Sequence, residues 1–215
     1  MKQIVIVMII LASNIYALFA SAGGLKNQGV TFSAAHILQW NEESFQGRTS
    51  YKKDGTSILA SCDDSASGMV LRRSIDLRDT PIMEWSWRVG SNFNLSVDQT
   101  TKKGDDFVAR IYVVKKSGLL PWDSYAINYV WAASLPSGFS WPNPFVKQVT
   151  MVAVRSGASR SPEQQITERR NILRDFQSIH GRDIESIDAV AIMTDCDNGH
   201  GKARAWYGPI KFLPE

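Results

Sequence analysis

An acidic turn near the C-terminus carries the residues best suited to bind a cation or a polar ligand. Asp195, Asp197 and Asn198 precede Gly199, and their side-chain oxygens are spaced as in calcium-binding loops. The bidentate Glu that completes an EF-hand is missing. Two interpretations remain: a structural calcium ion held by Asp195, Asp197 and Asn198, or an Asx-type turn whose side chains accept hydrogen bonds from backbone N–H groups. We expect no other cofactor.

Polar side chains also interrupt two strongly apolar runs. Arg110 lies within Phe107 to Val114, and Asn128 lies within Tyr125 to Ala133. A charge in such a setting needs a partner. Asp106 is four residues away, too far along an extended strand, so we expect the partner to come from a neighbouring strand.

We predict a ligand-binding groove built from these residues. Asp106, Arg110, Asn128 and Asp195 would supply hydrogen bonds, and Tyr129, Trp131 or Trp122 would stack on the ligand. The alternative is a buried structural network that binds nothing.

The sequence does not identify catalytic residues. Asp105 and Asp106 are adjacent, so on a strand they point to opposite faces and cannot act together as a pair of glycosidase carboxylates. One of them with Asp195 or Asp197 would serve if their strands were neighbours. The chain contains no Gly-rich phosphate loop, no G-x-S-x-G elbow and no dinucleotide fingerprint.

The elements that must position these residues are mostly strands. Short apolar runs between turn residues predict an antiparallel, jelly-roll-like β-sandwich. The apolar run from His36 to Trp40 is expected to lie within a strand, and Lys53-Asp54-Gly55 predicts a hairpin. In the run from Met83 to Val89, Trp85 and Trp87 share one face, which favours a core strand over a sugar-stacking platform. Ile187 to Phe212 predicts two strands joined by the acidic turn, and the polar loop from Gly90 to Gly104 is expected to form the rim of a groove.

One long helix is predicted between Ser161 and Gly181. Ser161 is suited to the N-cap, with Pro162 in the first turn, and Gly181 is suited to the end. Ile166, Leu173, Phe176 and Ile179 recur at helical spacing, so this helix would pack one face on the sandwich.

The N-terminus is typical of an export signal. Lys2 precedes an apolar run from Ile4 to Leu11, and Ala20-Ser21-Ala22 predicts cleavage after Ala22. We therefore expect a signal peptide over residues 1–22, one domain over residues 23–215, and a periplasmic or secreted protein. Cys62 and Cys196 are the two cysteines, and they either pair or remain buried thiols.

The charge of the chain excludes one class of partner. The formal net charge is +3, and the basic residues are scattered and not gathered into a stripe, which argues against nucleic-acid binding. After signal cleavage we expect no stable membrane insertion, and a polar small molecule, a glycan or a protein as partner.

Several stretches together resemble a bacterial family of exported proteins known as domain-of-unknown-function family 3047. The stretches include W-S-W-R-V at residues 85–89, D-D-F-V-A-R-I-Y-V-V at 105–114, I-N-Y-V-W-A at 127–132, E-R-R-N-I-L-R-D-F at 168–176 and A-I-M-T-D-C-D-N at 191–198. The order of strands is also similar to that of jelly-roll carbohydrate-binding modules. This resemblance implies an exported β-sandwich and leaves its activity open.

We therefore expect an exported, non-catalytic binding domain for a carbohydrate or similar polar ligand. The alternatives are a glycan-active hydrolase or lyase, and a structural or partner-binding domain without a small-molecule ligand.

Overall fold

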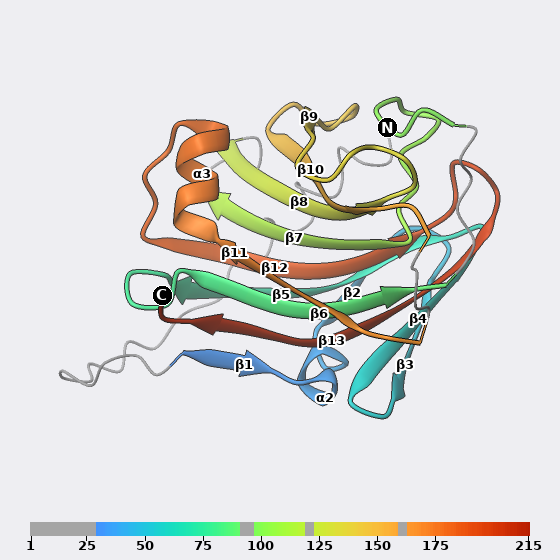
Figure 1. Cartoon of the computed structure of the whole chain (residues 1–215), viewed down its shortest axis with the longest axis horizontal. Coiled ribbons are helices and arrows are strands. Elements are labelled where there is room, and N and C mark those ends of the chain that lie inside the picture. The colour runs from blue at the N-terminus through green and yellow to red at the C-terminus, as the bar shows by residue number, and fades with distance from the viewer. Residues whose placement is uncertain (1–28, 91–96, 119–122, 159–162) are drawn as a thin grey trace.

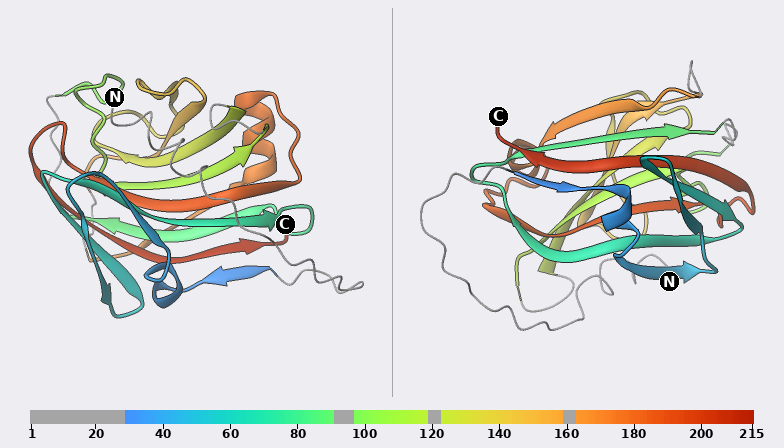
Figure 2. Two further views of the ribbon diagram at one scale, coloured as in Figure 1. Left: turned by 180° about the vertical axis from the view of Figure 1, so that it is seen from behind. Right: turned by 90° about the horizontal axis from the view of Figure 1, so that it is seen from below.

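The computed structural model describes residues 29–90, 97–118, 123–158 and 163–215, which form a sandwich of two β-sheets (Figure 1). Sheet A has the strand order β11-β6-β13-β4-β3, with β1 paired to β13. Sheet B has the order β2-β5-β12-β7-β8-β10-β9. The view from behind shows the same two layers, with β7 and β8 above and β13 and β1 below (Figure 2).

The bounds of the strands in sheet A are β1 Val30–Phe32, β3 Ser50–Asp54, β4 Ser57–Asp63, β6 Ile82–Val89, β11 Ile166–Asn171 and β13 Lys202–Leu213. Those of sheet B are β2 Asn41–Gln46, β5 Ala66–Asp76, β7 Ala109–Lys116, β8 Ser124–Ala132, β9 Ser140–Pro142, β10 Val149–Ser156 and β12 Ser186–Asp195. Two helices complete the described elements: α2, Ala34–Ile37, and α3, Ile172–His180. The predicted fold class, a mainly β antiparallel sandwich, is confirmed, and β8 and β10 form a parallel pair within it.

Alternation along the strands builds the core between the sheets. In β6, Met83, Trp85, Trp87 and Val89 are buried, and the residues between them are half-buried. The rings of Trp85 and Trp87 meet edge to face with centroids 5.4 Å apart. The interpretation of β6 as a core strand is therefore confirmed.

The two strands of the C-terminal stretch belong to different sheets. β12 pairs with β5 and β7 in sheet B, whereas β13 pairs with β4, β6 and β1 in sheet A. The acidic turn between them therefore crosses from one sheet to the other, at the end of the sandwich opposite α3 (Figure 1).

The predicted hairpin at Lys53-Asp54-Gly55 is confirmed. β3 and β4 pair in antiparallel register from Asp54 opposite Ser57, and Gly55 has a φ of +59°. A turn of this kind needs the left-handed region, where Gly has no Cβ to clash.

The long helix predicted from Ser161 to Gly181 is wrong over its first part. Residues 166–171 form β11, which pairs with β6 at the edge of sheet A. That edge offers backbone hydrogen bonds to a strand, and this tertiary pairing outweighs the local helical pattern. The helix is α3, nine residues long; its N-cap is Asn171, whose side chain accepts from the N–H of Arg174 at 3.0 Å. It ends at Gly181 as predicted, with a φ of +63°. The predicted N-cap, Ser161, lies outside the described residues.

A second local prediction is also wrong. The apolar run from His36 to Trp40 was expected within a strand, but residues 34–37 form α2, with Ser33 as its N-cap. The expected signal peptide lies outside the described residues. Among the residues that are described, no helix has the length and apolar character needed to cross a membrane.

A disulfide between Cys62 and Cys196 links the two sheets. Cys62 lies in β4 of sheet A, and Cys196 directly follows β12 of sheet B. The bond spans 134 residues of sequence. Both cysteines are buried, and of the two interpretations left open by the sequence the structure supports pairing.

Replacing both cysteines by Ala should lower the free energy of unfolding by about 4 to 5 kcal/mol. The unfolded chain then gains conformational entropy, because the cross-link that closes this long loop is gone. Urea unfolding followed by tryptophan fluorescence measures the difference. Reductant should lower the stability of the unaltered protein and leave that of the double variant unchanged. An unaltered protein that is insensitive to reductant under unfolding conditions would contradict the bond.

Candidate functional site

A buried ion pair joins β7 to β12. Arg110 and Asp195 are almost completely enclosed, with exposed fractions of 0% and 1%. The Nε of Arg110 donates to Oδ1 of Asp195 at 2.7 Å, and Nη2 donates to Oδ2. The partner of Arg110 therefore comes from the neighbouring strand, as predicted.

The rest of the guanidinium is also occupied. Nη2 donates to the backbone oxygen of Asp105, whose carboxylate lies 3.6 Å from Nη1. Nη1 donates to the hydroxyl of Tyr112 at 3.3 Å, and the ring of Phe107 lies 4.7 Å from Cζ. A buried charge is tolerated only with this degree of pairing.

Burial and charge act in opposite directions on this pair. Burial raises the pKa of the Asp195 carboxyl, and the guanidinium of Arg110 opposes that shift, while the nearby carboxylates of Asp106 and Asp105 add to it. Burial would lower the pKa of Arg110, but Asp195 raises it well above the ordinary value, so the guanidinium remains charged. Arg110 is the group that allows Asp195 to be ionised in the interior.

Asp106 fixes the acidic turn from the side of β7. Its Oδ1 accepts from the backbone N–H of Asn198 at 3.0 Å and from the side-chain amide of Asn198 at 3.1 Å. Its Oδ2 accepts from the N–H of Gly199 at 2.7 Å. A carboxylate that caps successive N–H groups is typical of a structural turn.

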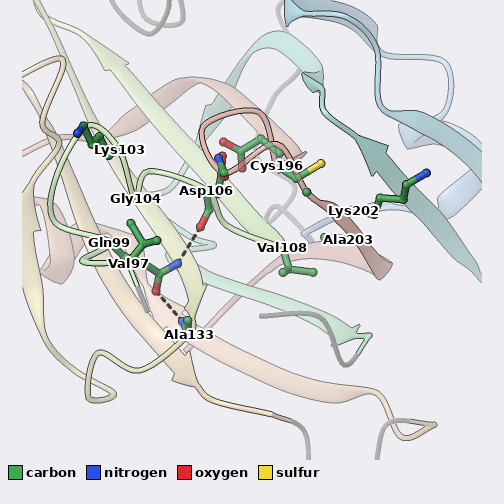
Figure 3. A pocket seen from close by; sticks show the side chains of 13 residues that line it. Val97, Gln99, Lys103, Gly104, Asp106, Val108, Ala133, Cys196, Lys202 and Ala203 are labelled. Atoms are coloured by element: carbon green, nitrogen blue, oxygen red, sulfur yellow. Dashed lines mark hydrogen bonds between the residues drawn. The ribbon is translucent and has the colours of Figure 1, made fainter. Parts of the chain in front are cut away.

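A cleft of about 510 Å³ opens beside this turn. The described end of the predicted rim loop forms one wall, as expected, through Val97, Gln99, Lys103 and Gly104. Figure 3 shows Lys202 and Ala203 on the opposite side, with Asp106 between the two walls. Gln99 braces its wall, because its amide donates to the backbone oxygen of Asp106 at 2.7 Å and accepts from the N–H of Ala133 at 2.6 Å.

The structure brings together only some of the predicted site residues. Among the described residues, Asp106 and Asp195 line the cleft, and Arg110 lies directly behind Asp195. Asn128 is fully buried in the middle of sheet B, with its amide nitrogen 3.3 Å from the sulfur of Met151. Trp122 lies outside the described residues.

Tyr129 and Trp131 do not reach the cleft. Both point into the core between the sheets, on the opposite face of β8 from Asn128, with exposed fractions of 0% and 2%. The hydroxyl of Tyr129 donates to Asp175 at 2.6 Å, and the indole N–H of Trp131 donates to the backbone oxygen of Gly157 at 2.8 Å. The two rings therefore pack in the core, and the prediction that they stack on a ligand is wrong.

An exposed aromatic side chain lies elsewhere. Phe139 is 42% exposed, and its ring stacks on that of Trp141 with centroids 5.6 Å apart. The ring of Trp141 in turn lies 6.1 Å from that of Phe107, which contacts Arg110. This stack of Phe139, Trp141 and Phe107 has no signal in the sequence, because a Phe beside a Pro-rich loop belongs to no periodic pattern.

The acidic cluster fits a calcium ion poorly. One side-chain oxygen each from Asp106, Asp195 and Asp197 lies within 4.8 Å of the others, so Asp106 joins two of the predicted ligands. The side-chain amide of Asn198, the third predicted ligand, donates to Asp106 at 3.1 Å. Both carboxylate oxygens of Asp195 accept from Arg110, and both of Asp106 accept from the turn. Calcium requires six to eight oxygen ligands, and these oxygens already have N–H partners. The arrangement favours the turn interpretation.

The family model described as protein of unknown function (DUF3047) matches residues 38–211, so the chain belongs to this family. The comparison with curated proteins found no match.

Solved structures of similar fold were found at low sequence identity. One is the family 11 carbohydrate-binding module of a cellulosomal cellulase of Clostridium thermocellum, with a TM-score of 0.46 and 15% identity over 91% of this chain and 97% of that chain. Another is the family 30 module of a cellulosomal cellulase of the same organism, with a TM-score of 0.45 and 10% identity over 86% of this chain and 98% of that chain. A cellulase derived from that of Rhodothermus marinus has a TM-score of 0.44 and 8% identity over 86% of this chain and 98% of that chain. These likenesses concern the fold and identify no ligand.

Replacing Arg110 by Met should lower the free energy of unfolding by about 3 to 5 kcal/mol at pH 8, because the carboxylates of Asp195 and Asp105 remain buried without their cation. In this variant burial raises the pKa of Asp195 unopposed. A carboxyl whose folded-state pKa is raised loses stability as the pH rises through that pKa, so the deficit relative to the unaltered protein should shrink towards pH 4. Urea unfolding of both proteins across this pH range measures the deficit.

Two controls accompany the measurement. Arg48→Met breaks an exposed pair with Glu42 and should cost less than about 1 kcal/mol. Arg110→Met combined with Asp195→Leu should recover part of the loss. A deficit that does not change with pH would show that Asp195 is not the source of the penalty.

Proposed function

We propose that this member of the DUF3047 family is a non-catalytic binding domain that holds a carbohydrate or similar polar ligand in the cleft beside the acidic turn. The observation that carries the proposal is the cleft itself. Its volume of about 510 Å³ lies within the range of small-molecule sites, and it adjoins a rigid network of buried charges.

The lining suits a ligand rich in hydroxyl groups. Lys103 and Lys202 supply donors. Oδ2 of Asp106 accepts one N–H, that of Gly199, and can accept a second hydrogen bond from a ligand. Short apolar side chains, Val108, Ala133 and Ala203, separate these groups. A hydroxyl both donates and accepts, so a sugar or similar polyol can satisfy both kinds of group at once.

The state of the carboxylates supports binding over catalysis. A glycosidase needs one carboxyl that can deliver a proton. Asp195 is held by Arg110 and by the N–H of Phe107 at 3.1 Å, and Asp106 is held by the acidic turn. Neither is free to protonate a leaving group without breaking the structure around it.

A glycan-active hydrolase is the second candidate. Oxygens of Asp106 and Asp195 lie within 4.8 Å of each other, and burial raises the pKa of Asp195. Release of reducing ends from any glycan that binds would favour this candidate over the binding domain.

We further propose that the protein works outside the cytoplasm, in the periplasm or after secretion. The disulfide is the support, since such bonds persist in oxidising compartments. The apolar segment with a small-residue cleavage site points the same way.

The proposal predicts that at least one soluble glycan raises the melting temperature of the purified protein, because a ligand that binds only the folded state stabilises it. Lys103→Glu and Lys202→Glu should each weaken that binding by roughly tenfold, as expected for the loss of a charge-assisted hydrogen bond. Calorimetric titration measures the affinities. Lys53→Glu, an exposed change on β3 outside the cleft, is the matched control.

Two results would contradict the proposal. One is the absence of a shift with every glycan in a broad panel. The other is a glycan whose affinity is the same for both cleft variants and the unaltered protein.

A further inference from the structure

We propose that the outer face of sheet B carries a second binding site, at the edge formed by β9, for a sugar ring of a neutral glycan. We call it the β9 site and define it by Asn128, Phe139 and Trp141. Strand β9 is the last strand of the sheet and lies beside β10 (Figure 1). None of the three residues lines the cleft, so the site is independent of the function proposed there.

Strand register places the polar groups of the site on one face. Met151 of β10 lies opposite Asn128 of β8 on one side and opposite Trp141 of β9 on the other. Residues directly opposite each other point to the same face of a sheet. The neighbour of Asn128 in β8, Tyr129, points into the core between the sheets. Asn128 and Trp141 therefore share the outer face, with Met151 between them.

Two buried polar atoms on this face lack a hydrogen-bond partner among the described residues. They are Oδ1 of Asn128 and Nε1 of Trp141, in side chains with exposed fractions of 0% and 6%. The amide nitrogen of Asn128 contacts the sulfur of Met151 at 3.3 Å, and a thioether is a weak acceptor. Exchanging the oxygen and nitrogen of this amide would leave its other end unpaired. The fold thus retains one acceptor and one donor that it does not use, at a cost in stability.

A sugar has the groups that these two atoms need. A hydroxyl both donates and accepts, so hydroxyls of one ring supply a donor to Asn128 and an acceptor to Trp141. The backbones of β8 and β9 are two strand spacings apart, about 10 Å, so a ligand with several hydroxyls is better placed than one water molecule to reach both atoms. The side chains of the site and of Met151 carry no charge, which favours a neutral ligand.

Aromatic rings supply the apolar part of the site. The ring of Phe139 stacks on that of Trp141, with centroids 5.6 Å apart and an interplanar angle of 22°. Phe139 is 42% exposed and adjoins a strand of only three residues at the edge of the sheet. An exposed side chain changes rotamer rapidly, so Phe139 can turn outward and uncover the indole. The apolar face of the sugar ring then takes the place of Phe139 on Trp141.

Calorimetric titration with neutral oligosaccharides of glucose, xylose and mannose tests the proposal. We expect saturable binding of at least one of them. Trp141→Phe keeps a ring but removes the N–H, and Asn128→Leu removes the acceptor, so each should weaken this binding roughly tenfold. Phe139→Ala should bind at least as tightly as the unaltered protein, because no ring has to be displaced from the indole.

Trp206→Phe is the matched control for Trp141→Phe. The indole N–H of Trp206 donates to Asp54 at 2.7 Å on sheet A, so the same substitution removes an N–H outside the site and should leave the affinity unchanged. Lys103→Glu, in the wall of the cleft, should also leave binding at the β9 site unchanged.

Asn128→Leu gives a second readout that needs no ligand. The midpoint of its urea unfolding should equal or exceed that of the unaltered protein, because an unpaired amide leaves the interior. A clear fall in the midpoint would show that the amide is already satisfied within the fold, and this would overturn the proposal. The same measurement verifies that Trp141→Phe is folded.

Three further results would overturn the β9 site. The first is the absence of saturable binding by any of these oligosaccharides. The second is equal affinity in Trp141→Phe, Asn128→Leu and Trp206→Phe. The third is binding that Lys103→Glu weakens and Trp141→Phe does not, because that binding belongs to the cleft.

Discussion

The buried pair of Arg110 and Asp195 is the interaction on which the candidate cleft depends. It joins two central strands of sheet B, and Asp195 is the last residue of β12, so the pair determines where the acidic turn begins. The same guanidinium holds the backbone of Asp105 and packs on Phe107. Two charges leave water at a high cost, and the surrounding hydrogen bonds offset that cost only while both partners are present. A single substitution of either partner is therefore expected to be costly at this end of the sandwich.

The turn that follows is restrained by contacts from both sheets. The disulfide ties it to β4, Asp106 caps its backbone N–H groups from the β7 side, and the N–H of Cys196 donates to the backbone oxygen of Ser65 at 3.0 Å. At the outer edge, His200 lies 2.8 Å from Asp64, and both residues have positive φ angles. A wall held in this way loses little conformational entropy when a ligand binds, which favours affinity from few contacts.

The acidic groups of the cleft are neutralised from within the fold. Arg110 and backbone N–H groups pair with the carboxylates, and lysines lie at the edge of the cleft. The cleft is therefore suited to a neutral, hydroxyl-rich ligand.

Alternation in the sequence determined which side chains share a face of a strand, and the tertiary structure decided which face is buried. In β8, Tyr129 and Trp131 are two residues apart and Asn128 directly precedes Tyr129, so alternation alone places the two rings on one face and the amide on the other, as in the structure. A period of two carries no information on which side the second sheet lies, so their burial in the core was decided only when sheet A packed there. The need of Arg110 for a partner also followed from the sequence, because a buried charge must be paired, but the identity of Asp195 followed from strand order. Residues 166–171 show the opposite case. Their local pattern favoured a helix, but the free edge of β6 made them a strand of the same sheet. Such backbone pairing joins residues far apart in the chain, so the local pattern does not reveal it.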